Sequence, residues 1–536
     1  QKDSRYYNPL SSAGPKSGSD AQTAKGFIEY GKLISSTSLN YVRTFARKHH
    51  LDVLAAYEIE SYQTDHASGE KSKLPSDKLT EPDNAAVLNS FKSATQAYRM
   101  ISYLSRLNYD YDDRYYIAGS YRRDGSSRLS PNNRWGNFWS VSGMWHLGNE
   151  NFMKAVKPVL SDVKIRASYG VNGNQPGSYY GYKGLYSYGE NYMEAAGSYE
   201  SAQPNDLLTW EKNYSLNLGI DLSFINRIFA SLEYYNRDTK DLLYSLPISA
   251  TTGFTSYLSN IGRLNNKGVE FELRTLNVVS NDFNWTSVFN LSHNRNKIVS
   301  LNGLLDQTIE GTWFIHKVGL PYHTFYVKEF AGVDPLTGSA QYYLNTKNED
   351  GSYNRELTTD AAKAESIPYK TATPKVSGGF TNILNYKWID LTFTLTYSLG
   401  GYSFDKLGTY IENGSSSIYS SRYNLPAYMM NRWQKPGDQT DTPRFVYGEP
   451  ATSTNSSRYI HSTDHLRLKN FTLGFTLPNQ WTQKLMIDKV RVYFSGNNLL
   501  TWAKWKQYDP ETPVNGEVFC EAPAMRTFSF GAQLSF

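Results

Sequence analysis

The chain ends on Arg526-Thr-Phe-Ser-Phe-Gly-Ala-Gln-Leu-Ser-Phe536, a stretch in which apolar and small polar residues alternate. Successive side chains of a strand point to opposite faces, so Phe528, Phe530 and Phe536 fall on one face. The other face carries Thr, Ser, Gly and Gln side chains. The stretch therefore predicts a strand with one apolar face and one polar face.

A final phenylalanine at the end of such a strand is typical of bacterial outer-membrane barrels, whose apolar face meets lipid and whose polar face meets a lumen. We predict that Phe528, Phe530 and Phe536 form the barrel-assembly signal. The composition agrees, because 15% of the 536 residues are aromatic and 43 are Tyr, and barrels place aromatic girdles at both membrane interfaces. The alternative is a Tyr-rich soluble β-protein.

Composition excludes several classes of protein. No stretch approaches the 18 apolar residues of a transmembrane helix. The net charge of +5 comes from 55 basic and 50 acidic residues, a balance that gives no support for nucleic-acid binding. Gln1-Lys-Asp-Ser-Arg5 is not a signal peptide. An exported barrel needs one, so we expect that it was removed or that the chain is not the start of its gene product.

Strand-like alternation recurs along the whole chain and predicts an all-β, antiparallel transmembrane barrel. We count about 17 strands. They are 39–45, 51–62, 98–109, 115–121, 138–147, 163–171, 214–224, 228–235, 269–273, 285–293, 322–330, 341–344, 376–384, 389–399, 466–477, 490–495 and the terminal strand.

Short and long links alternate between these strands, as periplasmic turns and extracellular loops do in outer-membrane barrels. The strand Leu39–Phe45 enters a short turn, so parity places residues 1–35 in an extracellular loop segment and residues 36–536 in the barrel. Bacterial barrels have even strand numbers as a rule. An odd count therefore indicates the C-terminal portion of a larger barrel, unless one strand is miscounted.

Alternation also assigns side chains to the inner wall. A Lys or Arg near the lipid midplane costs about 2–4 kcal/mol, so charged residues within apolar alternation should face the lumen. The predicted inner wall carries both signs, which suits a wet lumen or a polar plug. Its charged residues are Lys164, Arg166, Glu233, Glu270, Glu272 and Arg491.

Several runs resemble the SusC/RagA family of TonB-dependent outer-membrane transporters, in the family's order and over roughly residues 30–536. Each run alone is weakly specific. They include Arg122-Arg-Asp-Gly-Ser-Ser-Arg128, Asn133-Arg-Trp-Gly136, Ile165-Arg-Ala-Ser-Tyr-Gly-Val-Asn-Gly-Asn-Gln175, Asn260-Ile-Gly-Arg-Leu-Asn-Asn-Lys-Gly-Val-Glu-Phe271, Arg432-Trp-Gln-Lys-Pro-Gly-Asp438 and Ser495-Gly-Asn-Asn-Leu-Leu-Thr-Trp502.

The resemblance implies a barrel of about 22 strands, of the size whose lumen is plugged, with an N-terminal plug domain and a TonB box. Neither is in this sequence. The implied partners are TonB, acting through the missing part, outer-membrane lipid, and a SusD-like surface lipoprotein that caps the mouth. The implied cargo is a glycan or a peptide.

No catalytic or cofactor-binding constellation stands out among the nine scattered His residues. The nearest to a metal pattern is His461-Ser-Thr-Asp-His465, at a loop-to-strand junction where i and i+4 lie about 13 Å apart. We therefore predict no enzyme, no cofactor and no metal site.

The best candidate ligand or partner element is the tyrosine-rich loop that contains Tyr179, Tyr180 and Tyr182, because Tyr offers a flat apolar face and a hydroxyl. Trp313 and Tyr402 lie in other predicted surface loops. The alternative for all five is packing against neighbouring loops.

Three functions remain open. The first is active import of a large nutrient, an oligosaccharide or oligopeptide, energised through TonB and helped by a SusD-like lipoprotein. The second is a passive porin or structural outer-membrane barrel. The third, a membrane-embedded hydrolase, would need clustered catalytic side chains, and the scattered His residues argue against it.

Overall fold

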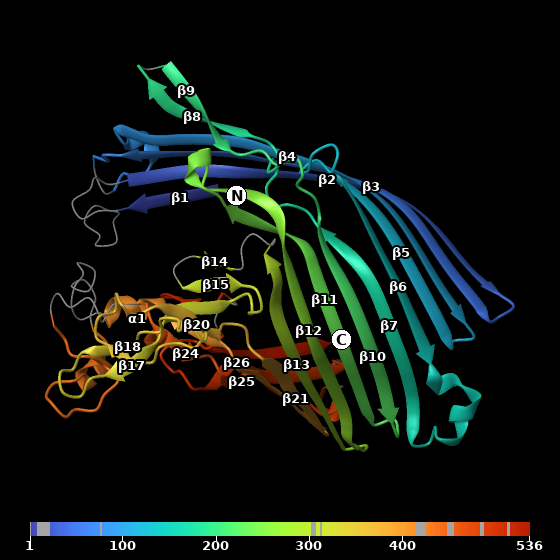
Figure 1. The fold of residues 1–536 in the computed structure, drawn as a ribbon. Helices are drawn as coiled ribbons and strands as arrows, with labels where there is room; N and C mark the ends of the chain where they lie inside the picture. Colours follow the sequence, from blue (N-terminus) through green and yellow to red (C-terminus); the bar gives the residue numbers. More distant parts are fainter. Residues whose placement is uncertain are drawn as a thin grey trace. The chain divides into compact units, whose positions relative to one another are not determined.

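The computed structural model describes residues 2–7, 22–75, 78–193, 195–301, 307–310, 313–412, 425–446, 455–482, 487–511 and 515–536. Antiparallel strands dominate this part of the chain (Figure 1). Its helices are all short, and none is long and apolar enough to cross a membrane.

Sixteen of the described strands make the largest sheet, in an order that follows the chain. Every neighbour pair whose register is given is antiparallel. We call this sheet the wall. Its strands are β1 (Lys2–Tyr7), β2 (Gln22–Phe45), β3 (His49–Ser72), β4 (Val87–Tyr111), β5 (Tyr115–Ser126), β6 (Trp135–His146), β7 (Leu160–Asn174), β10 (Glu211–Phe224), β11 (Ile228–Pro247), β12 (Ser256–Val279), β13 (Phe283–Leu301), β21 (Val376–Tyr386), β22 (Ile389–Leu399), β25 (His465–Thr476), β26 (Lys489–Ala503) and β28 (Thr527–Ser535).

The predicted alternation of short and long links holds along most of this order, with the β6–β7 and β25–β26 links as exceptions. Two or three residues join β2 to β3, β4 to β5, β10 to β11, β12 to β13 and β21 to β22. The link from β6 to β7 contains the 3₁₀ helices η2 (Leu147–Asn149) and η3 (Asn151–Ala155). The intervening links are longer, up to the one between β13 and β21.

Fifteen of the predicted strands lie in the wall, and two predictions need correction. The segments 322–330 and 341–344 are in small separate sheets, because their apolar side chains pack against other loop segments. The prediction also missed β1, whose residues Lys-Asp-Ser-Arg-Tyr-Tyr do not alternate. The described wall therefore has an even number of strands, so the argument from an odd count does not hold.

The strand predicted at 39–45 is longer than expected and extends across the predicted boundary at residue 36. β2 begins at Gln22 and pairs with β3 without a register shift up to Phe45. It has 24 residues, whereas about 9–11 suffice to cross a bilayer. Outside the lipid both faces of a strand meet water, so no apolar face is required there. Backbone pairing can therefore continue beyond the residues that alternate.

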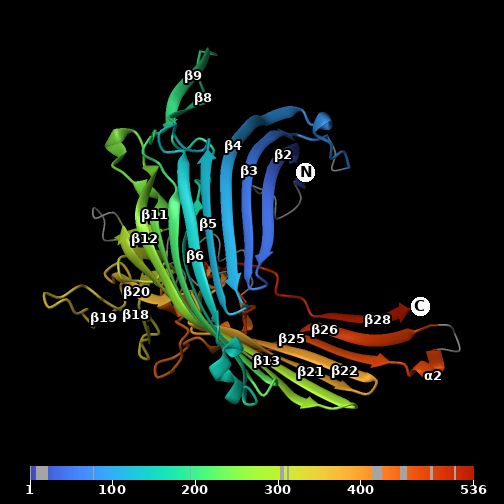
Figure 2. The same ribbon diagram turned by 90° about the vertical axis from the view of Figure 1, so that its right-hand side faces the viewer.

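The chain divides into two compact units, and each is described by itself. The first comprises residues 1–143, 169–214 and 239–261. Its small core includes Leu129 from the link between β5 and β6. The other buried members are Phe138, Val171, Leu208 and Trp210. The hairpin of β8 (Leu185–Tyr192) and β9 (Ala195–Ala202) forms its own two-stranded sheet and extends from the end of this unit (Figure 2).

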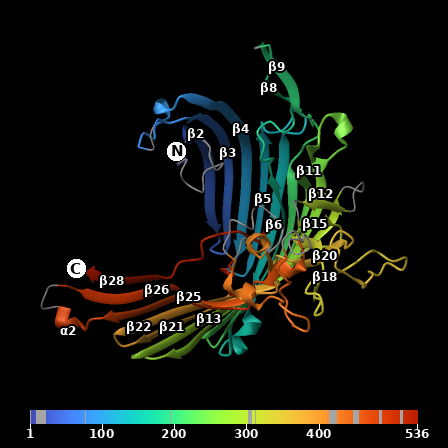
Figure 3. The ribbon, with the colours of Figure 1, turned by 90° about the vertical axis from the view of Figure 1, so that its left-hand side faces the viewer.

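The second unit comprises residues 144–168, 215–238 and 262–536. Its wall strands β13, β21, β22, β25, β26 and β28 lie side by side, as Figure 3 shows. The links after β13, β22 and β26 fold together into what we call the loop body. Its described residues are 307–310, 313–372, 402–412, 425–446, 455–464, 504–511 and 515–526.

Three small sheets build the loop body together with short helices. Their strands are β14 (Gln307–Glu310), β15 (Phe314–Lys317), β16 (Thr324–Lys328) and β20 (Ser366–Thr371); β17 (Phe330–Val333), β18 (Ala340–Tyr343) and β19 (Leu357–Thr358); and β24 (Ile460–Ser462), β23 (Tyr402–Asp405) and β27 (Glu517–Val518). The helices include α1 (Lys406–Ile411), η6 (Ala427–Asn431) and η8 (Ser457–Tyr459).

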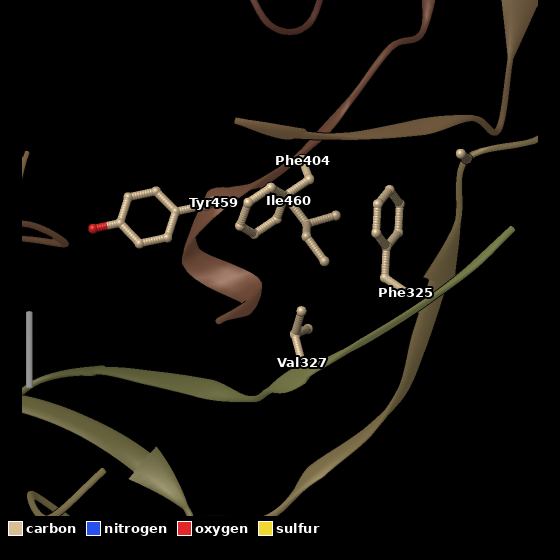
Figure 4. Packing of buried hydrophobic residues seen from close by; sticks show 6 residues of the cluster. Phe325, Val327, Phe404, Tyr459 and Ile460 are labelled. Carbon is tan, nitrogen blue, oxygen red and sulfur yellow. The ribbon is translucent and has the colours of Figure 1, made fainter. Parts of the chain in front are cut away.

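A compact apolar core holds the loop body together. Phe325, Phe404 and Tyr459 are at most 1% exposed, and Val327 and Ile460 pack with them. Figure 4 shows these side chains converging from separate segments, with the Tyr459 hydroxyl directed away from the others. The three links therefore pack around a common core instead of forming independent loops.

Candidate functional site

The inner face of the second unit carries paired charges of both signs. Arg166 on β7 donates through Nη1 to Glu233 Oε2 at 2.6 Å and through Nε to Asp221 Oδ2 at 3.2 Å. Arg491 on β26 donates to both carboxylate oxygens of Asp390, at 2.8 and 2.5 Å. Such bidentate pairs are among the stronger hydrogen bonds. The predicted inward-facing Arg166, Glu233 and Arg491 thus share one face with their partners.

The opposite face of the same strands is apolar and open. Leu218 on β10, Leu232 on β11 and Val492 on β26 are 43–46% exposed. In a soluble protein such a face would be buried, whereas a membrane barrel presents it to lipid. The two faces of the second unit's wall therefore have the chemistry that the alternation predicts.

The first unit has a denser polar network on its inner face. Arg122 on β5 donates through Nε to Asp124 Oδ1 at 2.7 Å and through Nη2 to Ser102 Oγ at 2.9 Å and Glu58 Oε1 at 3.3 Å. The buried Glu60 accepts a hydrogen bond from the Tyr98 hydroxyl. Sequence reasoning did not single out this network, although Arg122 and Asp124 lie in a family motif.

A cavity of about 450 Å³ opens beside Arg122 and Asp124. Its walls combine aromatic or apolar side chains with amides and hydroxyls, as ligand pockets in proteins generally do. They are formed by Met100, Leu104, Ser120, Arg122, Asp124, Phe138, Trp139, Ser140, Val171, Asn172, Gly173, Asn174, Gln175 and Trp210.

The three predicted tyrosines of the link after β7 are half-buried against the first unit. The Tyr179 ring stacks on Tyr98 at 5.7 Å, and the Arg128 guanidinium lies 4.5 Å from its centroid. The Tyr180 hydroxyl accepts from the backbone N–H of Ala97 at 3.2 Å, and Tyr182 packs against the small core. These contacts agree with the alternative left open by the sequence, in which the three tyrosines pack against neighbouring segments.

Exposed aromatics lie further along the same link, on the β8–β9 hairpin. Tyr188 and Tyr192 are 76% and 74% exposed, and Tyr186 and Tyr199 are more than half exposed. Sequence reasoning did not name them, because composition alone does not separate a packed tyrosine from an exposed one. Alternation of Tyr with small residues after Gly184 was the available signal.

Trp313 and Tyr402 are partly buried in the loop body, where they pack against its core. The Trp313 ring stacks on Phe404 at 4.6 Å and its Nε1–H donates to Glu517 Oε2 at 3.1 Å. Lys406 donates to the other oxygen of Glu517 at 2.7 Å. Trp313 therefore joins segments about 200 residues apart, and its contacts are internal to the loop body.

A buried charged cluster lies beside this core. Asp405 is 1% exposed, and burial raises the pKa of its carboxyl to about 6, with nearby Glu412 acting in the same direction. Glu412 pairs with Arg458 at 2.8 Å and accepts from the Tyr428 hydroxyl. Burial likewise lowers the pKa of His461 to about 4.

The link after β26 is bound to the wall by one buried cation. Arg467 on β25 is 3% exposed and donates to Asp509 Oδ1 at 2.5 Å and to Glu511 Oε2 at 2.9 Å. Breaking a buried pair of this kind leaves an uncompensated charge. Arg467 therefore fixes the link after β26 to the neighbouring wall strand β25.

The histidines of the 461–465 motif have separate environments. His461 stacks on Trp505 at 4.5 Å, and the Nδ1 of His465 is 2.8 Å from the carbonyl oxygen of Thr463. Within the described ranges, no three His, Cys, Asp or Glu side chains are grouped so that they could hold a metal ion.

The terminal phenylalanines are among the most exposed apolar side chains. Phe528, Phe530 and Phe536 are 62%, 83% and 82% exposed. Phe494, which faces Phe530 across the β26–β28 ladder, contacts the rings of both Phe528 and Phe530. This arrangement leaves a broad aromatic surface on β28, and its part in assembly stays a prediction.

Comparison with known proteins identifies relatives of the chain. Residues 3–499 match the family model described as TonB dependent receptor-like, beta-barrel. The chain is 31% identical to TonB-dependent receptor P3 of Formosa agariphila, over 94% of this chain and 52% of that protein. It is also 31% identical to TonB-dependent receptor SusC of Bacteroides thetaiotaomicron, over 88% of this chain and 47% of that one.

A solved structure of the RagAB peptide transporter matches the whole chain with a TM-score of 0.87 at 28% identity, over 58% of the matched chain. The chain spans about half the length of the curated relatives it matches.

Proposed function

Because the chain belongs to the TonB-dependent receptor-like β-barrel family of the outer membrane, we propose that it forms the wall of an active importer. Its cargo is a nutrient too large for a porin, an oligosaccharide or an oligopeptide, and import is energised through TonB. The observation that carries this proposal is the family match over residues 3–499. RagAB, which the chain resembles in structure, is described as a peptide transporter.

The inner wall supports a filled, polar lumen. An open channel selective for one ion sign would line its wall with one charge, whereas here Arg122 and Arg166 are each bound to two carboxylates. Networks of this kind suit the surface of a polar plug or an uncharged hydrophilic cargo. They favour the importer over the passive porin that is the alternative function.

We further propose that the partner is a SusD-like lipoprotein lid on the extracellular side. On the first unit the β8–β9 hairpin, and on the second unit the loop body, would each offer docking surface to this lid, because they lie in the longest links of the wall. Exposed Tyr188 and Tyr192 are better anchors than Trp313 or Tyr402, which are occupied inside the loop body. A lid on such surfaces would bury well over ~1,600 Å².

Uptake by cells that carry the complete gene product tests the importer. Fluorescent oligosaccharides and oligopeptides would be offered to the wild type, to a strain lacking TonB, and to cells treated with a protonophore. We expect uptake of one substrate class that is lost in both energy-deficient conditions. Uptake that persists without TonB, together with steady ion conductance in planar bilayers, would favour the passive porin.

A further inference from the structure

Two neighbouring side chains at the end of β6 point to opposite sides of the wall. Asp162 precedes Arg166 on β7 by an even number of residues, so it shares the polar inner face that Arg166 occupies. His146 Nε2 lies 2.6 Å from Asp162 Oδ1, which places His146 on the same inner face. Trp145 precedes His146 in β6 and therefore faces the lipid side.

The link that follows β6, residues 147–159, begins on the lipid-facing side of the wall. The Trp145 Nε1–H donates to Glu150 Oε1 at 3.1 Å, which holds the start of the link against that side. Val163 and Ile165 of β7 also face the lipid side, yet Val163 is 6% exposed and Ile165 is 43% exposed. The lipid-facing side of β7 is therefore covered at its end, where Figure 1 shows the link as a short helical segment.

Large apolar side chains are exposed on this link and on the turn beside it. Phe152, Val156 and Val159 of the link are 45–64% exposed. The backbone N–H of Ile225, in the turn between β10 and β11, donates to the carbonyl oxygen of Val159 at 2.8 Å. Ile225 is itself half exposed. The link and this turn, residues 225–227, therefore form one continuous surface, which we call the turn-side surface.

Within the turn-side surface, which the structure describes throughout, the exposed charges are all basic. They are Lys154, Lys157 and Arg227. Its one acidic residue is Glu150, which is 9% exposed. Such a surface fits the headgroup region of a membrane, where apolar side chains enter the acyl boundary and Lys or Arg side chains meet lipid phosphates.

We propose that the turn-side surface is an interfacial membrane anchor that binds the phosphate groups of anionic phospholipids. Short turns of outer-membrane barrels lie on the periplasmic side, so the lipid belongs to the periplasmic leaflet. Two observations favour lipid over a periplasmic protein as the occupant. The surface begins at the lipid-facing Trp145, and its exposed charges have one sign, opposite to that of phosphate.

The anchor would hold this end of the wall at a fixed depth in the membrane. Moving it toward the periplasm would expose the apolar side chains to water, and moving it inward would carry the basic side chains into hydrocarbon.

The anchor does not depend on the proposed import. It needs only a wall that spans the membrane, and a passive porin would be held by it equally. The two claims can fail separately, because the anchor is measured on purified protein in vesicles and import is measured as uptake by cells.

Quenching of single fluorescent labels in lipid vesicles tests the depth of the anchor. In the complete gene product, freed of other cysteines including Cys520, Phe152→Cys and Val156→Cys would each be labelled with bimane. The vesicles would contain phosphatidylcholine with a nitroxide near the top of the acyl chain. We expect both labels to be quenched by the nitroxide lipid and shielded from acrylamide in the water. Asp441→Cys, an exposed position in the loop body, is the matched control and should be quenched by acrylamide alone.

The headgroup is tested by moving the nitroxide from phosphatidylcholine to phosphatidylglycerol at the same mole fraction. Because nearby Lys and Arg side chains concentrate anionic lipid, phosphatidylglycerol should quench the Phe152→Cys label about twofold more strongly or better. Combined Lys154→Gln, Lys157→Gln and Arg227→Gln substitutions should bring the two lipids to equal quenching. Lys435→Gln in the loop body, also at an exposed lysine, should leave the preference unchanged.

Three results would overturn the proposal. Quenching of the Phe152→Cys and Val156→Cys labels by acrylamide instead of lipid would mean that the surface faces water or a periplasmic protein. Equal quenching by the two lipids without the glutamine substitutions would exclude binding of anionic headgroups. A preference for phosphatidylglycerol that survives the triple substitution would show that the three basic residues do not bind the phosphate. The two cysteine positions are independent and exposed, so the test stands if either variant fails to fold.

Discussion

The wall and the loop body of the second unit are built on opposite principles. On the wall, large apolar side chains such as Phe530 are mostly exposed, and order comes from backbone ladders with paired charges on the other face. In the loop body, Phe325 and Phe404 are fully buried, as in a soluble domain. In the wall, the contribution of a side chain to stability thus depends on the face that it occupies. In the loop body it depends on how well the side chain fills the core.

The largest difference in stability between the two regions should come from a substitution that creates a cavity in the loop-body core. Phe404→Ala removes a fully buried ring that stacks on Trp313, and such changes cost about 3–5 kcal/mol. Leu218→Ala on the open face of β10 leaves no cavity in the protein and should cost far less. Local unfolding measured by hydrogen exchange in the two variants checks this. Equal losses would show that the loop body has no core of its own.

A lysine introduced on the lipid-facing side of a wall strand should destabilise the protein more than one introduced on the lumen-facing side. Leu391 and Thr392 are neighbours in β22, and alternation assigns Leu391 to lipid and Thr392 to the lumen. Leu391→Lys should destabilise the folded protein by about 2–4 kcal/mol, and Thr392→Lys by much less. The free energy of unfolding of the two variants would be compared by denaturant titration in lipid vesicles. The folded fraction would be read from the shift in gel mobility between unheated and heated samples. The reverse order would mean that the faces have been assigned wrongly.

Deletion of Phe536 should reduce outer-membrane abundance far more than Ser535→Ala. The deletion removes an 82%-exposed aromatic from the end of the aromatic surface on β28, whereas Ser535 lies on the polar face. Quantitative immunoblots of outer-membrane fractions provide the comparison. If both variants reach wild-type abundance, the terminal aromatic has no part in assembly.

The smallest effect should come from a rim ion pair. The hydrogen bond from Arg355 lowers the pKa of Glu329 below 4.5, so this pair stabilises the loop body above that pH and the contribution is lost on acidification. Arg355 is half exposed, and removing it should cost less than about 1 kcal/mol. Hydrogen-exchange rates of the wild type and of Arg355→Ala at pH 4 and pH 7 test this pH dependence.

Much of the wall could be predicted from the sequence, because lipid on one face and water on the other impose a period of two. Where both faces meet water, as along the first part of β2, the signal vanishes and the strand was placed too short. β1 was missed for the same reason. Fifteen wall strands were found from this alternation, and their neighbour order follows chain order.

The loop body could not be predicted, because its core joins segments that are far apart in sequence. Phe404 and Tyr459 lie in stretches without periodicity, and the alternation around Phe325 predicted a wall strand instead. Only tertiary contacts bury these three side chains. Trp313 and Tyr402 looked like surface anchors for the same reason. The charged cluster at Asp405 carries no motif, since its carboxyl groups and Arg458 come from different segments.

Accessibility of single cysteines along β22 tests the two-faced wall most directly. In a Cys520→Ser background, each position from Ile389 to Leu399 would be replaced by Cys and labelled in intact outer membranes with a charged, membrane-impermeant maleimide. We expect labelling with a period of two, at Asp390, Thr392, Thr394, Thr396 and Ser398 and not at the alternate positions. Uniform labelling, or labelling of the apolar positions, would contradict a wall with lipid on one side and a wet lumen on the other.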